Sequence, residues 1–227
     1  MRKLQIILGV CCAVVIGSSS LVAAGFDEGV AVYRKGDFTT ALREFRISAG
    51  KGHTEAQFYL GLMYSHGLGV ARDQKEAAKW YLKAAELGHG RAQFIVGLKY
   101  DRGQGFVRDY EEAVKWYRKA AELGDSRAQR ALGLVYGLDE GFGQDYVRAH
   151  MWLNIAGANG NKDAIGERDI VAQKMTPGQI ADAQKLAREW VHKHCQRSHK
   201  SPGLSGTERI IQKEGAKPDC KGELNIF

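Results

Sequence analysis

Apolar and small residues recur along the chain in a pattern with a period of 36 residues. Each period has one stretch in which such residues lie four, five and eight positions after the first one. In a second stretch they lie three, four, seven and eight positions after the first one. In the second copy the two sets are Ala92, Val96, Gly97 and Tyr100, and then Ala113, Trp116, Tyr117, Ala120 and Ala121. Both spacings put side chains on one face of an α-helix. The pattern therefore predicts two helices per period.

Glycine-rich turns separate the two predicted helices of each copy. Gly103 and Gly105 follow the first helix of the second copy, and glycine reaches positive φ without a steric cost. Asp109 then stands at the position of an N-cap, and Glu112 has the spacing of a capping box. Gly124 predicts the end of the second helix.

The period predicts the architecture as well as the helices. Residues 54–89 and 90–125 agree at 21 of 36 positions, and residues 126–161 form a third copy without an insertion. A fixed period of this length is typical of stacked repeats, because a single repeat cannot bury its apolar face alone. Residues 25–53 keep part of the pattern and predict a degenerate N-terminal repeat.

The sequence after the third copy predicts a cap and a tail. Residues 162–195 contain two more helical stretches, the second beginning at Thr176-Pro177-Gly178-Gln179. Thr is a good N-cap and Pro suits the first helical position, so we predict C-terminal capping helices here. Residues 196–227 are rich in Ser, Gly, Pro, Lys and Glu, and we expect an irregular tail.

The first 24 residues have the features of an export signal. Arg2 and Lys3 precede an apolar run of about 13 residues, and the small residues that follow predict cleavage between Ala24 and Gly25. The run is shorter than the roughly 20 residues of a spanning helix. We expect an exported protein, periplasmic or secreted, without stable membrane insertion after cleavage. An uncleaved anchor is the alternative.

The charge distribution indicates which class of partner to exclude, and the cysteine count indicates whether a disulfide is expected. The net charge of +7 is spread without a dense basic stripe or interleaved aromatic residues, so the sequence predicts no nucleic-acid partner. Cys195 and Cys220 are the cysteines left after removal of the signal. An even number of cysteines in an exported protein predicts a disulfide between them.

Three local patterns resemble chemical sites. The Gly-x-Gly loops follow predicted helices rather than strands, which does not suit a phosphate cradle. Ser48 and Lys51 have the S-x-x-K spacing of serine acylases, but the chain has no SDN or KTG partner motif. A group of potential zinc or copper ligands lies near the end of the last predicted helix: His192, His194, Cys195 and His199. Their spacing fits no standard zinc finger. We expect no enzymatic activity, no cofactor and no metal.

The repeated pattern AQxxLGxxYxxGxGVxxDxxxAxxWxxKAAELG resembles the Sel1-like repeat (SLR), a relative of the tetratricopeptide repeat with longer loops. The second copy carries it as Ala92-Gln93, Gly97, Tyr100, Gly103, Gly105, Asp109, Ala113, Trp116, Lys119-Ala120-Ala121 and Gly124. The resemblance implies an all-α fold, a right-handed α-α superhelix (solenoid) of about ten helices built from 36-residue repeats.

The resemblance also implies a binding function. In solenoids of this kind the first helices line the concave face, and residues that vary between copies select the partner. The candidate partner-binding residues are Tyr59, Met63, His66, Lys99, Arg102 and Arg130. An aromatic residue and a methionine beside basic side chains would suit a protein or peptide with apolar and acidic anchors.

The sequence thus predicts a non-enzymatic protein-interaction scaffold or adaptor in the bacterial cell envelope. Two alternatives remain at this point. One is an envelope hydrolase or a carbohydrate- or β-lactam-binding protein, and the other is a metal-binding module built on the C-terminal histidines.

Overall fold

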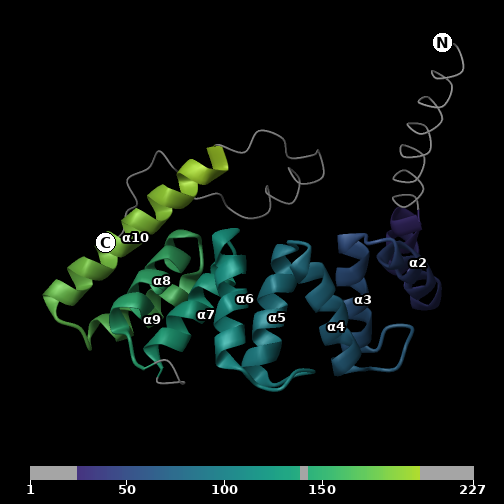
Figure 1. Cartoon of the computed structure of the whole chain (residues 1–227), viewed down its shortest axis with the longest axis horizontal. Helices are drawn as coiled ribbons and strands as arrows, with labels where there is room; N and C mark the ends of the chain where they lie inside the picture. Colours follow the sequence, from purple (N-terminus) through teal and green to yellow (C-terminus); the bar gives the residue numbers. More distant parts are fainter. Residues whose placement is uncertain (1–24, 139–142, 200–227) are drawn as a thin grey trace, which may run out of the picture. The chain divides into compact units, whose positions relative to one another are not determined.

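The computed structural model describes residues 25–138 and 143–199, and the side chains of residues 195–199 are outside this description. Every regular element within these residues is an α-helix. Residues 25–34 form the first helix. The helices after it are α2 (Phe38–Gly50), α3 (Thr54–His66), α4 (Gln74–Glu86), α5 (Gly90–Arg102), α6 (Tyr110–Glu122), α7 (Ser126–Gly137), α8 (Tyr146–Ala158), α9 (Lys162–Ala172) and α10 (Pro177–His199) (Figure 1). The prediction of an all-α repeat solenoid is confirmed.

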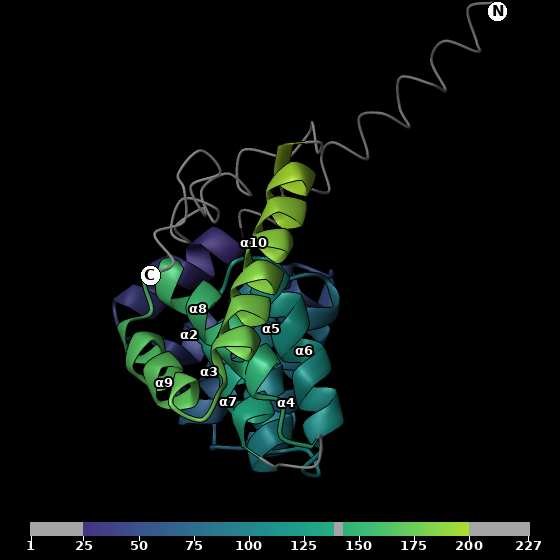
Figure 2. The ribbon, with the colours of Figure 1, turned by 90° about the vertical axis from the view of Figure 1, so that its left-hand side faces the viewer.

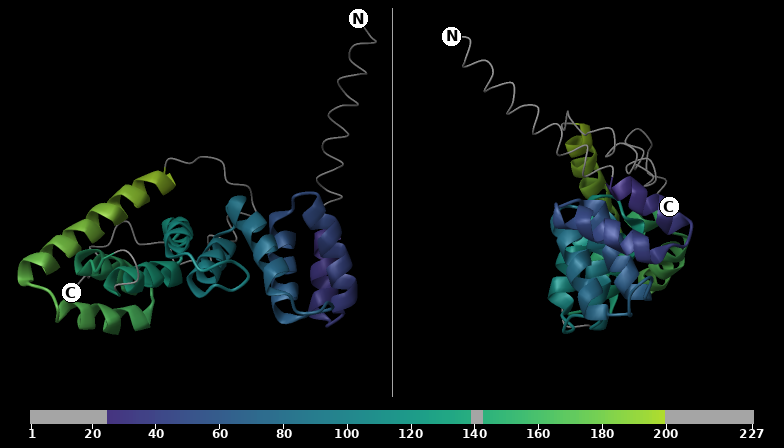
Figure 3. Two further views of the ribbon diagram at one scale, coloured as in Figure 1. Left: turned by 60° about the horizontal axis from the view of Figure 1, so that its bottom comes forward. Right: turned by 90° about the vertical axis from the view of Figure 1, so that its right-hand side faces the viewer.

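The chain divides into two compact units. Within the described residues, unit 1 comprises residues 25–92 and 103–107, and unit 2 comprises residues 93–102 and 108–199. In unit 1, α2 packs on α3 and α3 packs on α4 (Figure 3). In unit 2, α6 packs on α7 and α7 on α8, while α8 also contacts α9 and α10 (Figure 2). Within each unit, these helices bury their apolar stripes against one another, and α8 is the helix on which both α9 and α10 pack.

A glycine in the first helix of each repeat lets the second helix approach closely. A Cβ atom on Gly61 would lie 2.6 Å from Cδ1 of Tyr81, and one on Gly97 would lie 2.5 Å from Cδ1 of Tyr117. In the third repeat, a Cβ on Gly133 would lie 2.5 Å from Cγ of Leu153. Real Cβ atoms do not approach other heavy atoms so closely. We call these contacts the glycine seams.

The degenerate N-terminal copy has a glycine seam of its own. A Cβ on Gly29 would lie 2.7 Å from Cε1 of Phe45 in α2. Only residues 35–37 separate the two helices here, whereas residues 67–73 separate α3 from α4. The turn is four residues shorter than in the following repeat, which is why the sequence pattern of this copy matches the others less well.

Loop glycines join each repeat to the one before it in unit 1. Gly69 has a φ of 67°, and a Cβ on it would lie 2.5 Å from the carbonyl oxygen of Phe38, the first residue of α2. Gly105 has a φ of 89°, and a Cβ there would overlap the carbonyl oxygen of Gln74, the first residue of α4. Glycine is therefore required twice over, for the backbone conformation and for the close approach. In these two loops the Gly-x-Gly pattern has a structural role, as the sequence indicated.

The helix starts are capped as the sequence predicts. Asp109 accepts a hydrogen bond from the backbone N–H of Glu112 at 3.0 Å. Thr176 and Gln179 form a reciprocal capping box at the start of α10, with bonds of 2.8 and 3.3 Å. α10 continues to His199, four residues beyond the predicted boundary at 195. Residues 200–227 lie outside the described residues, so the irregular tail stays a prediction.

Two helices of the first half are capped by histidine instead of a carboxylate or amide. Nδ1 of His53 accepts from the backbone N–H of Ala56 at 3.2 Å, and Nδ1 of His89 accepts from that of Ala92 at 3.0 Å. The corresponding caps of α7 and α9 are Asp125 and Asn161. A histidine cap works only while Nδ1 is unprotonated, so the His53 cap of α3 depends on pH.

The surroundings of His53 favour its neutral form. Its ring stacks on Phe26 with centroids 4.3 Å apart. Burial lowers the pKa of His53, and the carboxylates of Glu55 and Asp27 act in the opposite direction without reversing the shift. His89 differs because its Nε2 lies 3.2 Å from Oε1 of Glu55. The hydrogen bond from His89 lowers the pKa of Glu55.

Gly97→Ala should destabilise the protein by about 1–3 kcal/mol, because the new methyl group overlaps the fully buried ring of Tyr117. Gly166→Ala in α9 is the matched control, since a Cβ there meets nothing within 4 Å. We expect this control to stabilise by roughly 0.5–1 kcal/mol, the usual gain for replacing a helical glycine with alanine. Urea denaturation of both variants measures the difference, and equal stabilities would contradict the glycine seam.

Acidification from pH 7 to pH 5 should destabilise the wild type more than His53→Asn. The pKa of His53 is lower in the folded chain than in the unfolded one. The unfolded chain therefore binds a proton at a pH where the folded chain does not, and stability falls as the pH drops from about 6.5 towards the folded pKa. Asn caps without titrating, as Asn161 does, and an N-cap bond is worth about 1 kcal/mol.

Denaturation midpoints at the two pH values test this difference. His66→Asn makes the same substitution at an exposed position of the same helix and should keep the acid sensitivity of the wild type. An identical loss of stability in wild type and His53→Asn would show that the His53 cap does not control it.

Candidate protein-interaction surfaces

The predicted partner-binding residues fall into three structural groups. Met63 and Lys99 occupy the same repeat position and are buried, with exposed fractions of 0% and 4%. Val135 occupies this position in the third copy and is also buried, at 4%. The position is therefore buried in all three copies, and its variation from Met to Lys to Val does not change an exposed surface. In this structure Met63 and Lys99 have almost no surface to offer a partner.

Tyr59 belongs to an aromatic cluster in unit 1. Its ring stacks on Phe45 with centroids 4.9 Å apart, and it meets the edges of Tyr33 and Phe26 at 5.5 and 5.9 Å. Offset and edge-to-face pairs of this kind stabilise a core beyond the area they bury. Tyr59 is half-buried, so most of its ring is used inside the unit.

His66 and Arg102 remain available on the surface. Each is the last residue of the first helix of its repeat and is exposed. Leu138 follows α7 at the same repeat position and is 52% exposed. Each copy thus presents a different side chain at one recurring exposed point, which we call the first-helix end.

Arg130 contacts the C-terminal cap. Its Nε donates to Oε2 of Glu167 in α9 at 2.8 Å, and its Nη2 pairs with Oε1 of the same carboxylate. This bond to Glu167 raises the pKa of the Arg130 guanidinium. The side chains of Arg130 and Glu167 are 35% and 23% exposed. Arg130 therefore ties α7 to α9, a role that the repeat pattern does not reveal because its partner lies outside the repeats.

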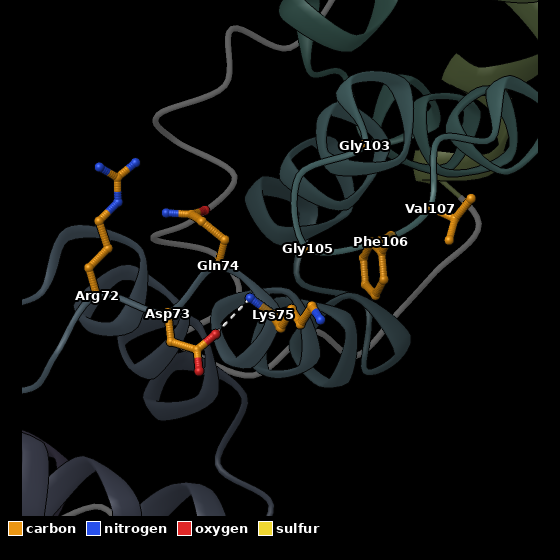
Figure 4. A pocket seen from close by; sticks show the side chains of 8 residues that line it. All are labelled: Arg72, Asp73, Gln74, Lys75, Gly103, Gly105, Phe106 and Val107. Atoms are coloured by element: carbon orange, nitrogen blue, oxygen red, sulfur yellow. Dashed lines mark hydrogen bonds between the residues drawn. The ribbon is translucent and has the colours of Figure 1, made fainter.

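A hollow of about 540 Å³ lies in unit 1, between the start of α4 and the loop that follows α5 (Figure 4). Arg72 and Lys75 lie on the α4 side, and Phe106 and Val107 lie on the loop side. The sequence reasoning did not select these residues, because it considered only the first helices. A comparison of the copies could have found them: Lys75 aligns with Thr39 and Glu111, and Val107 aligns with Ala71 and Gly143.

Ser48 does not have the surroundings of a nucleophile. It lies within α2 and is 1% exposed, and its Oγ has no hydrogen-bond partner among the described residues. Lys51 is exposed and follows the end of the helix. An S-x-x-K catalytic site needs an accessible hydroxyl near a base, so the hydrolase alternative gains no support from this pair.

The predicted C-terminal sites are only partly covered by the structure. Nδ1 of His194 lies 2.8 Å from the carbonyl oxygen of Trp190, and the two rings stack at 3.9 Å. The part of the chain that is described contains no cluster of three potential metal ligands. The side chains of Cys195 and His199, and the whole of Cys220, lie outside the described residues, so the disulfide stays a prediction.

Arg130→Ala and Glu167→Ala should be energetically coupled by about 1 kcal/mol in a double-mutant cycle, because the pair is half-buried and bound at two points. Lys115 and Glu112 form an exposed ion pair one helical turn apart in the same unit, and their coupling should be clearly weaker because solvent screens the two charges. Equal coupling in the two cycles would contradict a structural role for Arg130.

Comparisons with known proteins agree with this fold. The Sel1 repeat family model matches residues 54–89, 90–125 and 126–161. A Sel1 repeat protein from Oxalobacter formigenes has a similar structure, with a TM-score of 0.59 and 26% identity over 85% of each chain. A protective antigen of uropathogenic Escherichia coli that displays an SLR fold has a TM-score of 0.53 and 28% identity, over 82% of this chain and 49% of the antigen.

Sequence relatives share only a part of their length with this chain. An exopolysaccharide production negative regulator of Rhizobium meliloti is 38% identical over 61 residues, which are 27% of this chain and 23% of the regulator. The chain thus spans less than a quarter of the regulator. The matched repeats, their glycine seams and the similar solved structures agree, and the chain is a Sel1-like repeat protein.

Proposed function

We propose that this protein is a non-enzymatic interaction scaffold of the bacterial cell envelope that binds a protein or peptide through its first-helix ends. Sel1 repeat proteins typically mediate protein–protein interaction. The observation that carries the proposal is the contrast between constant and variable positions. Gly61, Gly97 and Gly133 are buried and invariant between copies, whereas His66, Arg102 and Leu138 are exposed and different.

This contrast fits a scaffold better than an enzyme. Packing does not restrict an exposed position, so the chemical type there can differ between repeats and can serve recognition of a partner. Arg102 and Leu138, both in unit 2, would suit a partner with acidic and apolar groups, and His66 offers a polar contact in unit 1. Ser48 is buried, so the S-x-x-K pair does not supply an accessible nucleophile for the hydrolase alternative.

Export is the second part of the proposal and rests on the sequence. Arg2 and Lys3, the apolar run after them and the small residues up to Ala24 support a cleaved signal. Among the described residues, no helix has the length and apolarity to cross a bilayer. The signal features of the first 24 residues make the envelope the place to look for the partner.

Affinity capture from envelope extract tests the proposal, with the full chain expressed with its own N-terminus as bait. A second bait carries His66→Ala and Arg102→Ala. The control bait carries Glu86→Ala and Glu122→Ala, two exposed residues at one repeat position of the second helices. We expect a partner that the wild type and the control retain, and that the His66/Arg102 bait retains about tenfold less, a loss of about 1.4 kcal/mol.

Two outcomes contradict the proposal in different ways. Equal retention by all three baits would place the binding surface away from the first-helix ends. The absence of any protein enriched on the wild-type bait over a beads-only control would contradict the scaffold role itself.

A further inference from the structure

We propose that the hollow between the start of α4 and the 103–107 loop is a docking site for an extended protein segment that pairs a carboxylate with an apolar side chain. This inference rests on the proposed role in binding another protein, but not on the first-helix ends. The site lies wholly within unit 1.

The two sides of the hollow are fixed in place. Gly105 packs so closely on the carbonyl of Gln74 that a Cβ atom would not fit between them. The side-chain amide of Gln74 donates to the carbonyl of Ser65 in α3 at 2.9 Å. The loop is therefore held against α4, and α4 against α3, before a partner arrives. A preformed site loses less conformational entropy on binding than a flexible one.

The apolar contribution comes from the loop. Val107 is 89% exposed, more than the other exposed large apolar side chains of the described residues. The corresponding positions in the neighbouring copies hold Ala71 and Gly143. Phe106 beside it is half-buried and also lines the hollow. A solvent-exposed valine next to an aromatic ring offers an apolar anchor point to a partner.

The charge of the hollow comes from α4 and the residue two before it. The side chains of Arg72 and Lys75 are exposed and make no hydrogen bond, ion pair or ring contact with the described residues. The neighbouring copies differ at both positions. Arg108 aligns with Arg72 but stacks over Tyr110 at 5.3 Å, and Glu111 aligns with Lys75. Of the three full copies, only the first has two basic side chains at these positions without such a contact to the described residues.

Asp73 also lines the hollow, but its carboxylate is engaged. Oδ1 accepts from the backbone N–H groups of Lys75 and Glu76 at 2.9 and 3.0 Å. Figure 4 shows the first of these bonds beside the exposed side chains. The carboxylate thus offsets the partial positive charge of the helix N-terminus. The net charge of the lining side chains stays positive, and an acidic segment complements it.

Peptide selection tests the site. Random peptides displayed on phage are selected on the full chain and counter-selected on Lys75→Glu. This variant should fold, because an acidic residue is favourable in the first turn of a helix and Glu111 stands at the same position in the next repeat. We expect the surviving peptides to place Asp or Glu next to a Leu, Ile or Phe residue.

The strongest selected peptide is then synthesised and its affinity is measured by fluorescence anisotropy. Lys75→Glu and Val107→Asp should each weaken binding by about tenfold. A peptide with Lys in place of its acidic residue should recover affinity for Lys75→Glu. Lys162→Glu is the matched control, because it reverses an exposed charge in the first turn of α9 and should bind as the wild type does.

The result would overturn the inference if no peptide survives counter-selection, if the survivors carry no acidic residue, or if Lys75→Glu and Lys162→Glu bind the peptide equally. Failure here is distinguishable from failure of the scaffold role. A partner from envelope extract that is lost by the His66/Arg102 bait but retained by Lys75→Glu would uphold the scaffold and place its binding surface elsewhere.

Discussion

The close approach of two helices at a glycine is the contact on which each repeat depends. Gly61 and Gly97 admit the rings of Tyr81 and Tyr117, and Gly133 admits Leu153. Without a Cβ atom, the first helix brings its backbone against a large side chain, and that side chain fills the space between the helices. The alanines around it, such as Ala120, are completely buried for the same reason. The fold therefore depends on small residues as much as on large apolar ones.

The turns extend this constraint from one repeat to the next. Gly69 and Gly105 reach conformations with positive φ and touch the first residues of α2 and α4. The contact of Gly105 with Gln74 orders the loop of the second copy, and this loop forms one side of the hollow. Arg72 and Lys75 lie on the other side. A structural requirement of the repeat thereby produces a surface on which residues are free to vary, since only the glycine positions are restricted.

The sequence contained nearly all the information about the fold and less about the surfaces. Helix positions, the Asp109 cap and the Thr176 capping box follow from local chemistry and could be predicted. The Arg130–Glu167 contact could not, because it joins a repeat to a cap without the same period. The shorter turn of residues 35–37 could not be predicted, because the N-terminal copy keeps only part of the repeat pattern.

Variation between copies marks a binding surface only when burial is known as well. Met63, Lys99 and Val135 vary as much as His66, Arg102 and Leu138, but the first set is buried and the second is largely exposed. At a buried position the surrounding residues of the array decide which side chain fits, so variation there does not by itself mark a binding surface. At an exposed position, packing against neighbouring residues does not decide which side chain fits. Lys75 and Val107 satisfy both criteria, because they differ from their counterparts and face solvent. A repeat protein of this kind can therefore evolve a new contact at a turn without disturbing the glycine seams that hold its helices together.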